Sequence, residues 1–138
     1  MTWFIYAFIG TFLFAAMLLI FRYLGNLGVK ESTILLYVFG IGTIFFIGHS
    51  LVTHSPMKVN TKVFLLLVLA TAFSYAGNLL FTKSLLIAPN PGYATAVDAF
   101  RVLLITVAAI FLFGSELTLL KGIGAVLMVA GVVLLGIG

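Results

Sequence analysis

The sequence contains no cysteine and very few charged residues. Of its 138 residues, only 7% are Asp, Glu, Lys or Arg, while 64% are hydrophobic. A soluble domain carries about 25% charged residues, and a chain of this length has too much surface relative to its volume to hide so much hydrocarbon. The absence of cysteine also excludes structural disulfides and thiolate metal sites. The composition predicts an integral membrane protein with a single domain, residues 1–138.

Clusters of catalytic or metal-binding side chains are missing as well. We find no Ser/His/Asp set, metal-ligand cluster or phosphate-binding loop, so the sequence predicts neither an enzyme nor a bound cofactor. His49 and His54 are five residues apart, a spacing that suits neither one helix face nor one metal ion, and we expect His54 at a membrane interface. The Lys and Arg residues stand singly, which argues against a nucleic-acid groove. The N-terminal apolar run lacks the basic start and cleavage site of a signal peptide, and we interpret it as a retained helix.

Apolar segments of membrane-spanning length dominate what is present. Five of them predict an all-α, polytopic membrane protein, and the breaks between them contain Gly, Pro, Asn and charged residues. The predicted helices cover residues 3–23, 33–52, 63–87, 92–113 and 123–137. An odd number of spans places the two ends of the chain on opposite sides of the membrane.

The segment 92–113 carries two full charges, Asp98 and Arg101, where a spanning helix is expected to have none. Each costs several kcal/mol at bilayer depth, and such residues usually face a bundle interior or a watery cavity. At spacing i, i+3 they share a helix face and can pair, which lowers the cost. We predict a substrate-binding or proton-coupling centre here, with Asp98 carrying a proton and Arg101 holding an anionic group. A structural salt bridge at a helix contact is the alternative.

Tyr75, Asn78 and Tyr93 are further candidates for the substrate-binding site. Their side chains offer hydrogen bonds, and the tyrosine rings can face a cation. Hydrogen bonding between helices is an equally common role for such groups in membranes.

The C-terminal part of the chain resembles the end of one repeat in the EamA-like family of the drug/metabolite transporter superfamily. That repeat ends in a long helix, a small residue followed by Glu, a short amphipathic turn, and a final helix with two spaced glycines. Here these features are Ser115-Glu116, residues 117–121, and Gly124 with Gly131. Residues 78–88 resemble the end of the family's third helix.

The resemblance implies a five-helix transporter repeat and, for Gly124 and Gly131, a contact between subunits. Most family members carry two repeats in inverted orientation, with substrate bound between repeats near the midplane. In the more distantly related small multidrug transporters, glycines at this spacing in the last helix mark the dimer seam. Packing within one chain is the alternative role. The acidic residue that the small multidrug transporters carry in their first helix is absent here.

The distribution of basic residues gives almost no orientation signal. Three lie on each predicted side of the membrane: Lys58, Lys62 and Lys121 on one, and Arg22, Lys30 and Lys83 on the other. Such a balance is typical of a protein inserted in both orientations, and an antiparallel homodimer would rebuild the family's inverted pair of repeats.

These observations predict a secondary transporter in the cell membrane. It would move a small metabolite or a cationic compound by alternating access, without covalent chemistry, as an antiparallel homodimer. Two alternatives stay open. One is a non-transporting scaffold or partner subunit of a heteromeric complex, and the other is one half of a heterodimer.

Overall fold

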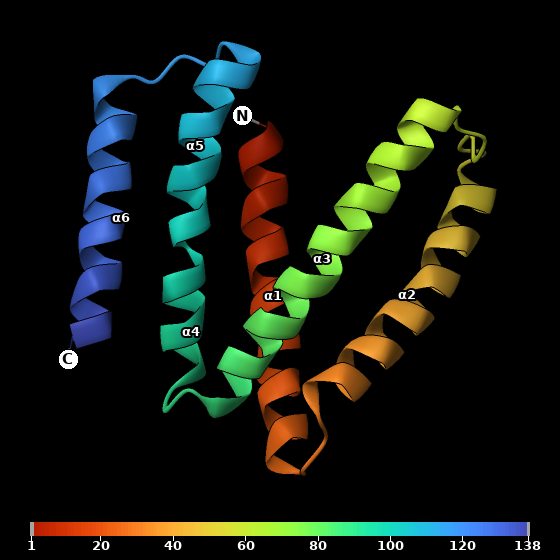
Figure 1. The fold of residues 1–138 in the computed structure, drawn as a ribbon, viewed down its shortest axis with the longest axis horizontal. Helices are drawn as coiled ribbons and strands as arrows, with labels where there is room; N and C mark the ends of the chain where they lie inside the picture. The colour runs from red at the N-terminus through yellow and green to blue at the C-terminus, as the bar shows by residue number, and fades with distance from the viewer. Residues whose placement is uncertain (1, 138) are drawn as a thin grey trace. The chain divides into compact units, whose positions relative to one another are not determined.

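The protein is entirely helical over the range that the structure, a computed structural model, describes, residues 2–137. Its helices are α1 (Thr2–Asn26), α2 (Glu31–Val52), α3 (Thr61–Ile87), α4 (Pro91–Asp98), α5 (Phe100–Phe113) and α6 (Leu119–Ile137) (Figure 1). Four segments are long and apolar enough to cross a membrane, because α4 and α5 together form one of them. The fifth is the shorter apolar helix α6. The predicted all-α fold with five membrane segments is confirmed.

The fourth predicted helix, residues 92–113, is divided in the structure. α4 ends at Asp98 and α5 begins at Phe100, with Ala99 between them. The Val102 N–H donates to the Ala99 carbonyl at 2.9 Å, three residues back instead of four. A tightened turn of this kind inside an α-helix is the 3₁₀ pattern. The predicted segment 92–113 is therefore one membrane segment made of two helices. The apolar pattern continues across Ala99, so the sequence gives no sign of this local change in backbone hydrogen bonding.

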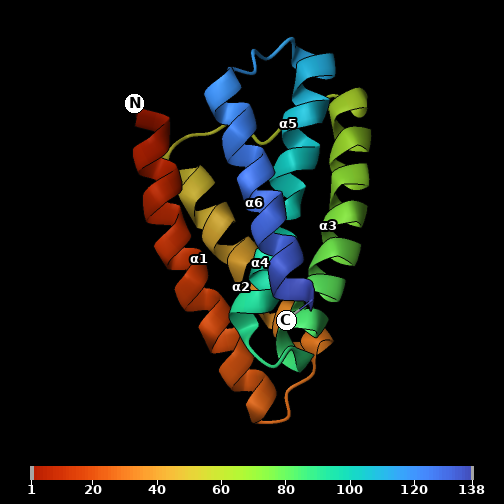
Figure 2. The same cartoon turned by 90° about the vertical axis from the view of Figure 1, so that its left-hand side faces the viewer.

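The helices group into two compact units, Met1–Ile87 and Ala88–Gly138. In the first unit, α1, α2 and α3 all contact one another, and in the second unit α4, α5 and α6 do the same. Figures 1 and 2 both show α6 running alongside the segment that α4 and α5 form. The single domain over residues 1–138 stays a prediction.

Glycines in the left-handed conformation end two of the helices. Gly28 has φ +82° and Gly114 has φ +61°, a region that favours residues without a Cβ. After α1, the Val29 N–H donates to the Leu24 carbonyl at 3.1 Å, which is the Schellman pattern. At the end of α5, the Gly114 N–H donates to the Ile110 carbonyl at 3.1 Å. Both glycines fall in breaks that the sequence predicts.

The first unit is packed tightly at one end. All side chains that are buried in the described chain lie where α1 ends, α2 begins and α3 ends: Phe21, Ile34, Leu35, Thr82 and Leu85. Figures 1 and 2 show α1 and α3 converging at this end and diverging toward the other. Since lipid tails are as apolar as leucine, close packing and hydrogen bonds hold such a contact together.

Arg22 ties α1 to the last turn of α3 at this packed end. Its Nη1 donates to the carbonyl of Leu85 at 3.1 Å and also to the carbonyl of Leu86. The final carbonyls of a helix lack partners within the helix and carry the negative end of its dipole, so a guanidinium satisfies both needs. Gly25, one turn further along α1, makes the close approach possible, because a Cβ there would lie 2.5 Å from Leu86 Cδ2. The sequence places Arg22 only among the basic residues on one predicted side of the membrane.

We expect Arg22→Leu to destabilise the protein by about 1.5–3 kcal/mol, the contribution of a hydrogen bond to a charged group. The variant leaves two carbonyls of α3 without their donor while keeping an apolar side chain of similar reach. Thermal unfolding in detergent measures the loss. Lys83→Leu is the matched control, since this exposed lysine lies near the end of α3, where the Arg22 side chain binds. Equal losses in the two variants would show that charge at this end, and not the carbonyl contact, sets the stability.

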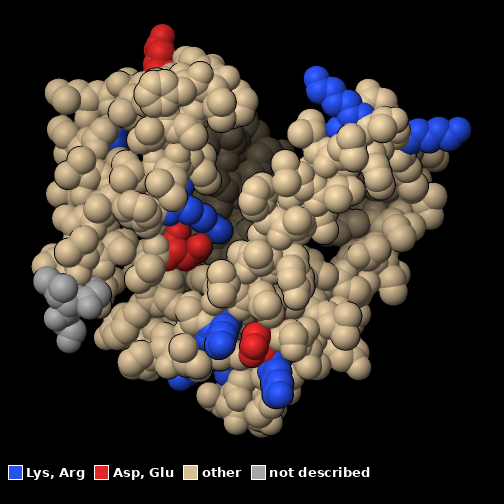
Figure 3. All heavy atoms as spheres, viewed as in Figure 1, with Lys and Arg blue, Asp and Glu red and all other residues tan. Residues whose placement is uncertain are grey.

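Apolar side chains cover most of the outer surface. Phenylalanines, leucines, isoleucines and valines of every long helix are exposed. On the face shown in Figure 3, acidic and basic atoms are scattered thinly over an otherwise uncharged surface. A surface of this size and character requires lipid as its solvent. The protein is an integral membrane protein with several passes.

Candidate functional site

Asp98 and Arg101 form an ion pair in the fourth membrane segment. Arg101 Nη2 lies 3.2 Å from Asp98 Oδ2, as the i, i+3 spacing predicts. The Asp98 side chain is 26% exposed and the Arg101 side chain 68% exposed, so the carboxylate is the more enclosed partner. It is the one salt bridge found within residues 2–137. The two residues stand on either side of Ala99, so the pair spans the break between α4 and α5.

Backbone hydrogen bonding changes register at the same place. The Ala99 N–H is shared between the carbonyls of Thr95, at 3.1 Å, and Ala96, at 3.2 Å. Three residues later, the Val102 N–H donates back to the Ala99 carbonyl. A stretch of 3₁₀ bonding inside a helix often marks a hinge. A bend here would change the distance between the two charges that flank it, so the geometry couples helix shape to the ion pair.

The start of α4 positions Tyr93. The Asn90 side-chain oxygen accepts a hydrogen bond from the Gly92 N–H at 2.8 Å, and Pro91 takes the first helical position. Tyr93 follows in the first turn, 45% exposed. It is five residues before Asp98, which places the two side chains about 140° apart around the helix. Tyr93 and Asp98 therefore share a segment but not a helix face.

A pocket of about 540 Å³ lies between α2 and α3 in the first unit. Its lining residues recur every three or four positions on each helix, so one face of α2 opposes one face of α3. Its volume is within the range of about 300–1,000 Å³ that is common for ligand sites. The walls are mostly apolar, and all lining residues found in the described chain are uncharged. Those that bear a hydroxyl are Ser32, Thr43, Thr71, Ser74 and Tyr75.

Tyr75 and Asn78 have different surroundings on α3. Tyr75 lines the pocket and is 69% exposed. Asn78 bonds within its own helix, because its Nδ2 donates to the Ser74 carbonyl at 2.8 Å and to the Ser74 hydroxyl at 3.1 Å. The structure thus joins Asp98 to Arg101 in the second unit and places Tyr75 and Asn78 in the first. The role of all these residues and of Tyr93 in substrate binding stays a prediction.

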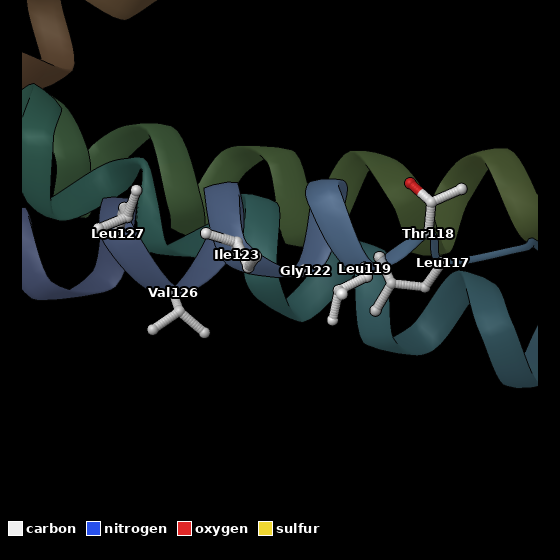
Figure 4. A pocket seen from close by; sticks show the side chains of 7 residues that line it. All are labelled: Leu117, Thr118, Leu119, Gly122, Ile123, Val126 and Leu127. Carbon is white, nitrogen blue, oxygen red and sulfur yellow. The ribbon is translucent and has the colours of Figure 1, made fainter.

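A second pocket, of about 460 Å³, lies at the beginning of α6 (Figure 4). Residues of the preceding loop, Leu117 and Thr118, form it together with the first turns of the helix. Thr118 supplies the hydroxyl seen in Figure 4, and the other labelled residues are apolar or glycine. Ligand sites combine apolar walls with a few convergent polar groups. The pocket between α2 and α3 meets this description better.

A model of the EamA-like transporter family matches residues 1–137. The chain belongs to this family. Its membership confirms the resemblance seen in residues 78–88 and 92–138, and it identifies the protein as a membrane transporter and not an enzyme. No curated protein matches the chain, and no solved structure does so either.

Gly124 and Gly131 of this EamA-like transporter have open space beside them. A Cβ built at either position would meet no atom within 4 Å. Within the second unit, neither glycine therefore makes the close helix contact that packing inside one chain would require, as far as the described residues show. A role in a subunit contact stays a prediction.

Sequence reasoning did not identify the pocket between α2 and α3 in this EamA-like transporter. The signal was present, since Ser32, Phe39 and Thr43 follow one another at helical spacing on one face of α2. Thr71 and Ser74 do the same on α3. A pair of hydroxyl-bearing faces on neighbouring spans would have been the pattern to look for.

Proposed function

We propose that this EamA-like transporter is a secondary transporter that moves a small metabolite or a cationic compound by alternating access, as an antiparallel homodimer. The observation that carries the proposal is the ion pair of Asp98 and Arg101 across a helix break inside a membrane segment. Charges are retained in spanning helices chiefly where they serve transport or coupling. A break beside them supplies the bend that alternating access needs.

The two charges have complementary tasks in this proposal. While paired, Asp98 and Arg101 reduce each other's cost in the membrane. When the helix bends at Ala99, the pair separates, Asp98 takes up a proton and Arg101 is free to hold an anionic group. Tyr75, Asn78 and Tyr93 would contribute hydrogen bonds or an aromatic face to the substrate. Release of the proton on the other side restores the pair.

Two observations support the antiparallel homodimer. Within the second unit, open space beside Gly124 and Gly131 leaves a face of α6 available for close helix approach. The equal numbers of Lys and Arg residues on the two predicted sides favour insertion in both orientations. A two-fold axis in the membrane plane would then relate two copies as inverted repeats are related in other transporters.

Reconstitution into liposomes tests the transport function. We expect that at least one solute from a panel of small metabolites and lipophilic cations dissipates an imposed pH gradient faster than it does in protein-free liposomes. A pH-sensitive dye inside the vesicles measures the proton movement. If no solute in the panel moves protons, and the protein is instead recovered in a stable complex with another membrane protein, the scaffold alternative replaces transport.

A further inference from the structure

We propose that the pocket between α2 and α3 binds an uncharged small molecule with an apolar, ring-sized body and an N–H or O–H donor. The inference rests on the proposed transport function and narrows its substrate class, because Tyr75, which we propose to contact the substrate, lines this pocket. It selects the small metabolite over the cationic compound. The argument uses only residues of the first unit.

Two of the five hydroxyls that line the pocket, those of Thr43 and Thr71, are available to a ligand only as hydrogen-bond acceptors. Thr43 Oγ1 donates its proton to the Phe39 carbonyl at 2.8 Å, and Thr71 Oγ1 donates to the Leu67 carbonyl at 2.8 Å. A threonine hydroxyl has one proton, and here that proton is already donated. Each oxygen can therefore act toward a ligand only as a hydrogen-bond acceptor. One acceptor thus comes from α2 and one from α3, both lining the pocket. A ligand that donates a hydrogen bond satisfies them.

Apart from the hydroxyls of Ser32, Ser74 and Tyr75, the remaining walls are apolar. Leu35, Leu36, Phe39 and Leu79 surround the hydroxyls, and the side of the pocket at Gly40 is open, since a Cβ there would meet nothing within 4 Å. No lining residue of the described chain is acidic. A permanent cation would lose its hydration here without gaining a counter-charge. The Tyr75 ring alone offers a weaker attraction than the hydration that the cation gives up.

Indole is a suitable probe because it combines an uncharged aromatic body with one N–H donor. 1-Methylindole is its matched control, with nearly the same shape and no donor. We expect purified protein in lipid nanodiscs to bind radiolabelled indole saturably, and to bind 1-methylindole about tenfold more weakly, since loss of a hydrogen bond in an apolar site costs on this order. Tetraphenylphosphonium, a lipophilic cation, should not compete.

Gly40→Leu locates the site. The leucine Cβ would meet no atom within 4 Å, and the rest of its side chain would extend into the pocket, so we expect indole affinity to fall by about tenfold or more. Gly42→Leu is the matched control, because Gly42 also has open space, lies two residues away on the same helix and does not line the pocket. Unchanged thermal stability of both variants shows that they fold.

Several results would overturn the inference. These are no saturable indole binding, equal binding of the two indoles as expected for a groove filled by a lipid chain, competition by the cation, or equal effects of the two leucines. A protein that binds indole as expected yet moves no solute in liposomes would retain the pocket and lose the proposed transport cycle. A protein that transports solutes with an intact Asp98 requirement but fails the indole test would lose only the pocket assignment.

Discussion

Asp98→Asn is expected to abolish proton-driven solute movement and to reduce it to the rate of protein-free liposomes. Asparagine has the shape of aspartate but cannot carry a proton between the two sides of the membrane. The exchange also removes the partner of Arg101, which lies 3.2 Å away, and leaves an unpaired cation inside a membrane segment. The measurement is gradient-driven uptake of whichever solute the liposome panel identifies, compared at equal amounts of inserted protein.

Loss of the partner charge predicts a second effect, on stability. An unpaired charge at the centre of a spanning helix costs about 2.5–3.5 kcal/mol on insertion scales. The double variant Asp98→Asn with Arg101→Gln removes both charges, so its stability should return toward that of the native protein. Its transport should not return, because the proton carrier is still missing. Thermal unfolding and uptake, measured on the same samples, separate the two effects.

The double variant also separates the functional role of the ion pair from a structural one. If the pair served only to join α4 to α5, uptake would recover together with stability when both charges are gone. Glu116→Gln makes the same chemical change at a carboxylate outside the regular helices, in the loop between α5 and α6. This control should transport normally. Equal loss in Glu116→Gln would show that the assay responds to acidic residues generally and not to this site.

The fold could be predicted from the sequence to the level of its five membrane segments, because hydropathy over about 20 residues determines which parts of a chain lie in lipid. The breaks were also visible, since Gly28, Gly114 and the Pro89–Pro91 turn mark them directly. The ion pair followed from the i, i+3 spacing of Asp98 and Arg101. Each of these features depends on neighbours in sequence.

Features that depend on which helix faces which could not be predicted in the same way. Arg22 bonds to carbonyls 63 and 64 residues away, and its sequence neighbourhood resembles any interfacial arginine. At the break, the Ala99 N–H is shared between two carbonyls, and the Val102 N–H donates to the carbonyl three residues back. The residues of this stretch all suit a continuous helix. The pocket between α2 and α3 exists only because these two helices pair, and the sequence does not show which helices pair. Apolar side chains are so general in a membrane that their pattern does not specify partners.

Gly131→Leu is expected to convert a detergent-solubilised dimer to monomer, with a loss of association of about tenfold or more. Without a hydrophobic force between helices in lipid, a seam of small residues holds by close backbone contact, and a leucine would separate the two helices. A Cβ at this position meets no atom within 4 Å in the described chain, so the fold of one subunit should tolerate the substitution. Sedimentation or light scattering of the purified protein measures the state.

Ala130→Leu is the control for this seam, because residue 130 lies at the same depth on α6 but is turned by about 100° around the helix. A dimer that survives at Gly131→Leu and dissociates at Ala130→Leu would move the contact to another face. Orientation is tested separately with a two-colour reporter fused after Gly138. Signal from both sides of the membrane agrees with the balanced lysines and arginines and makes the α6 contact antiparallel. Signal from one side only would overturn the antiparallel homodimer, and the heterodimer with a second chain of opposite orientation would be tested next.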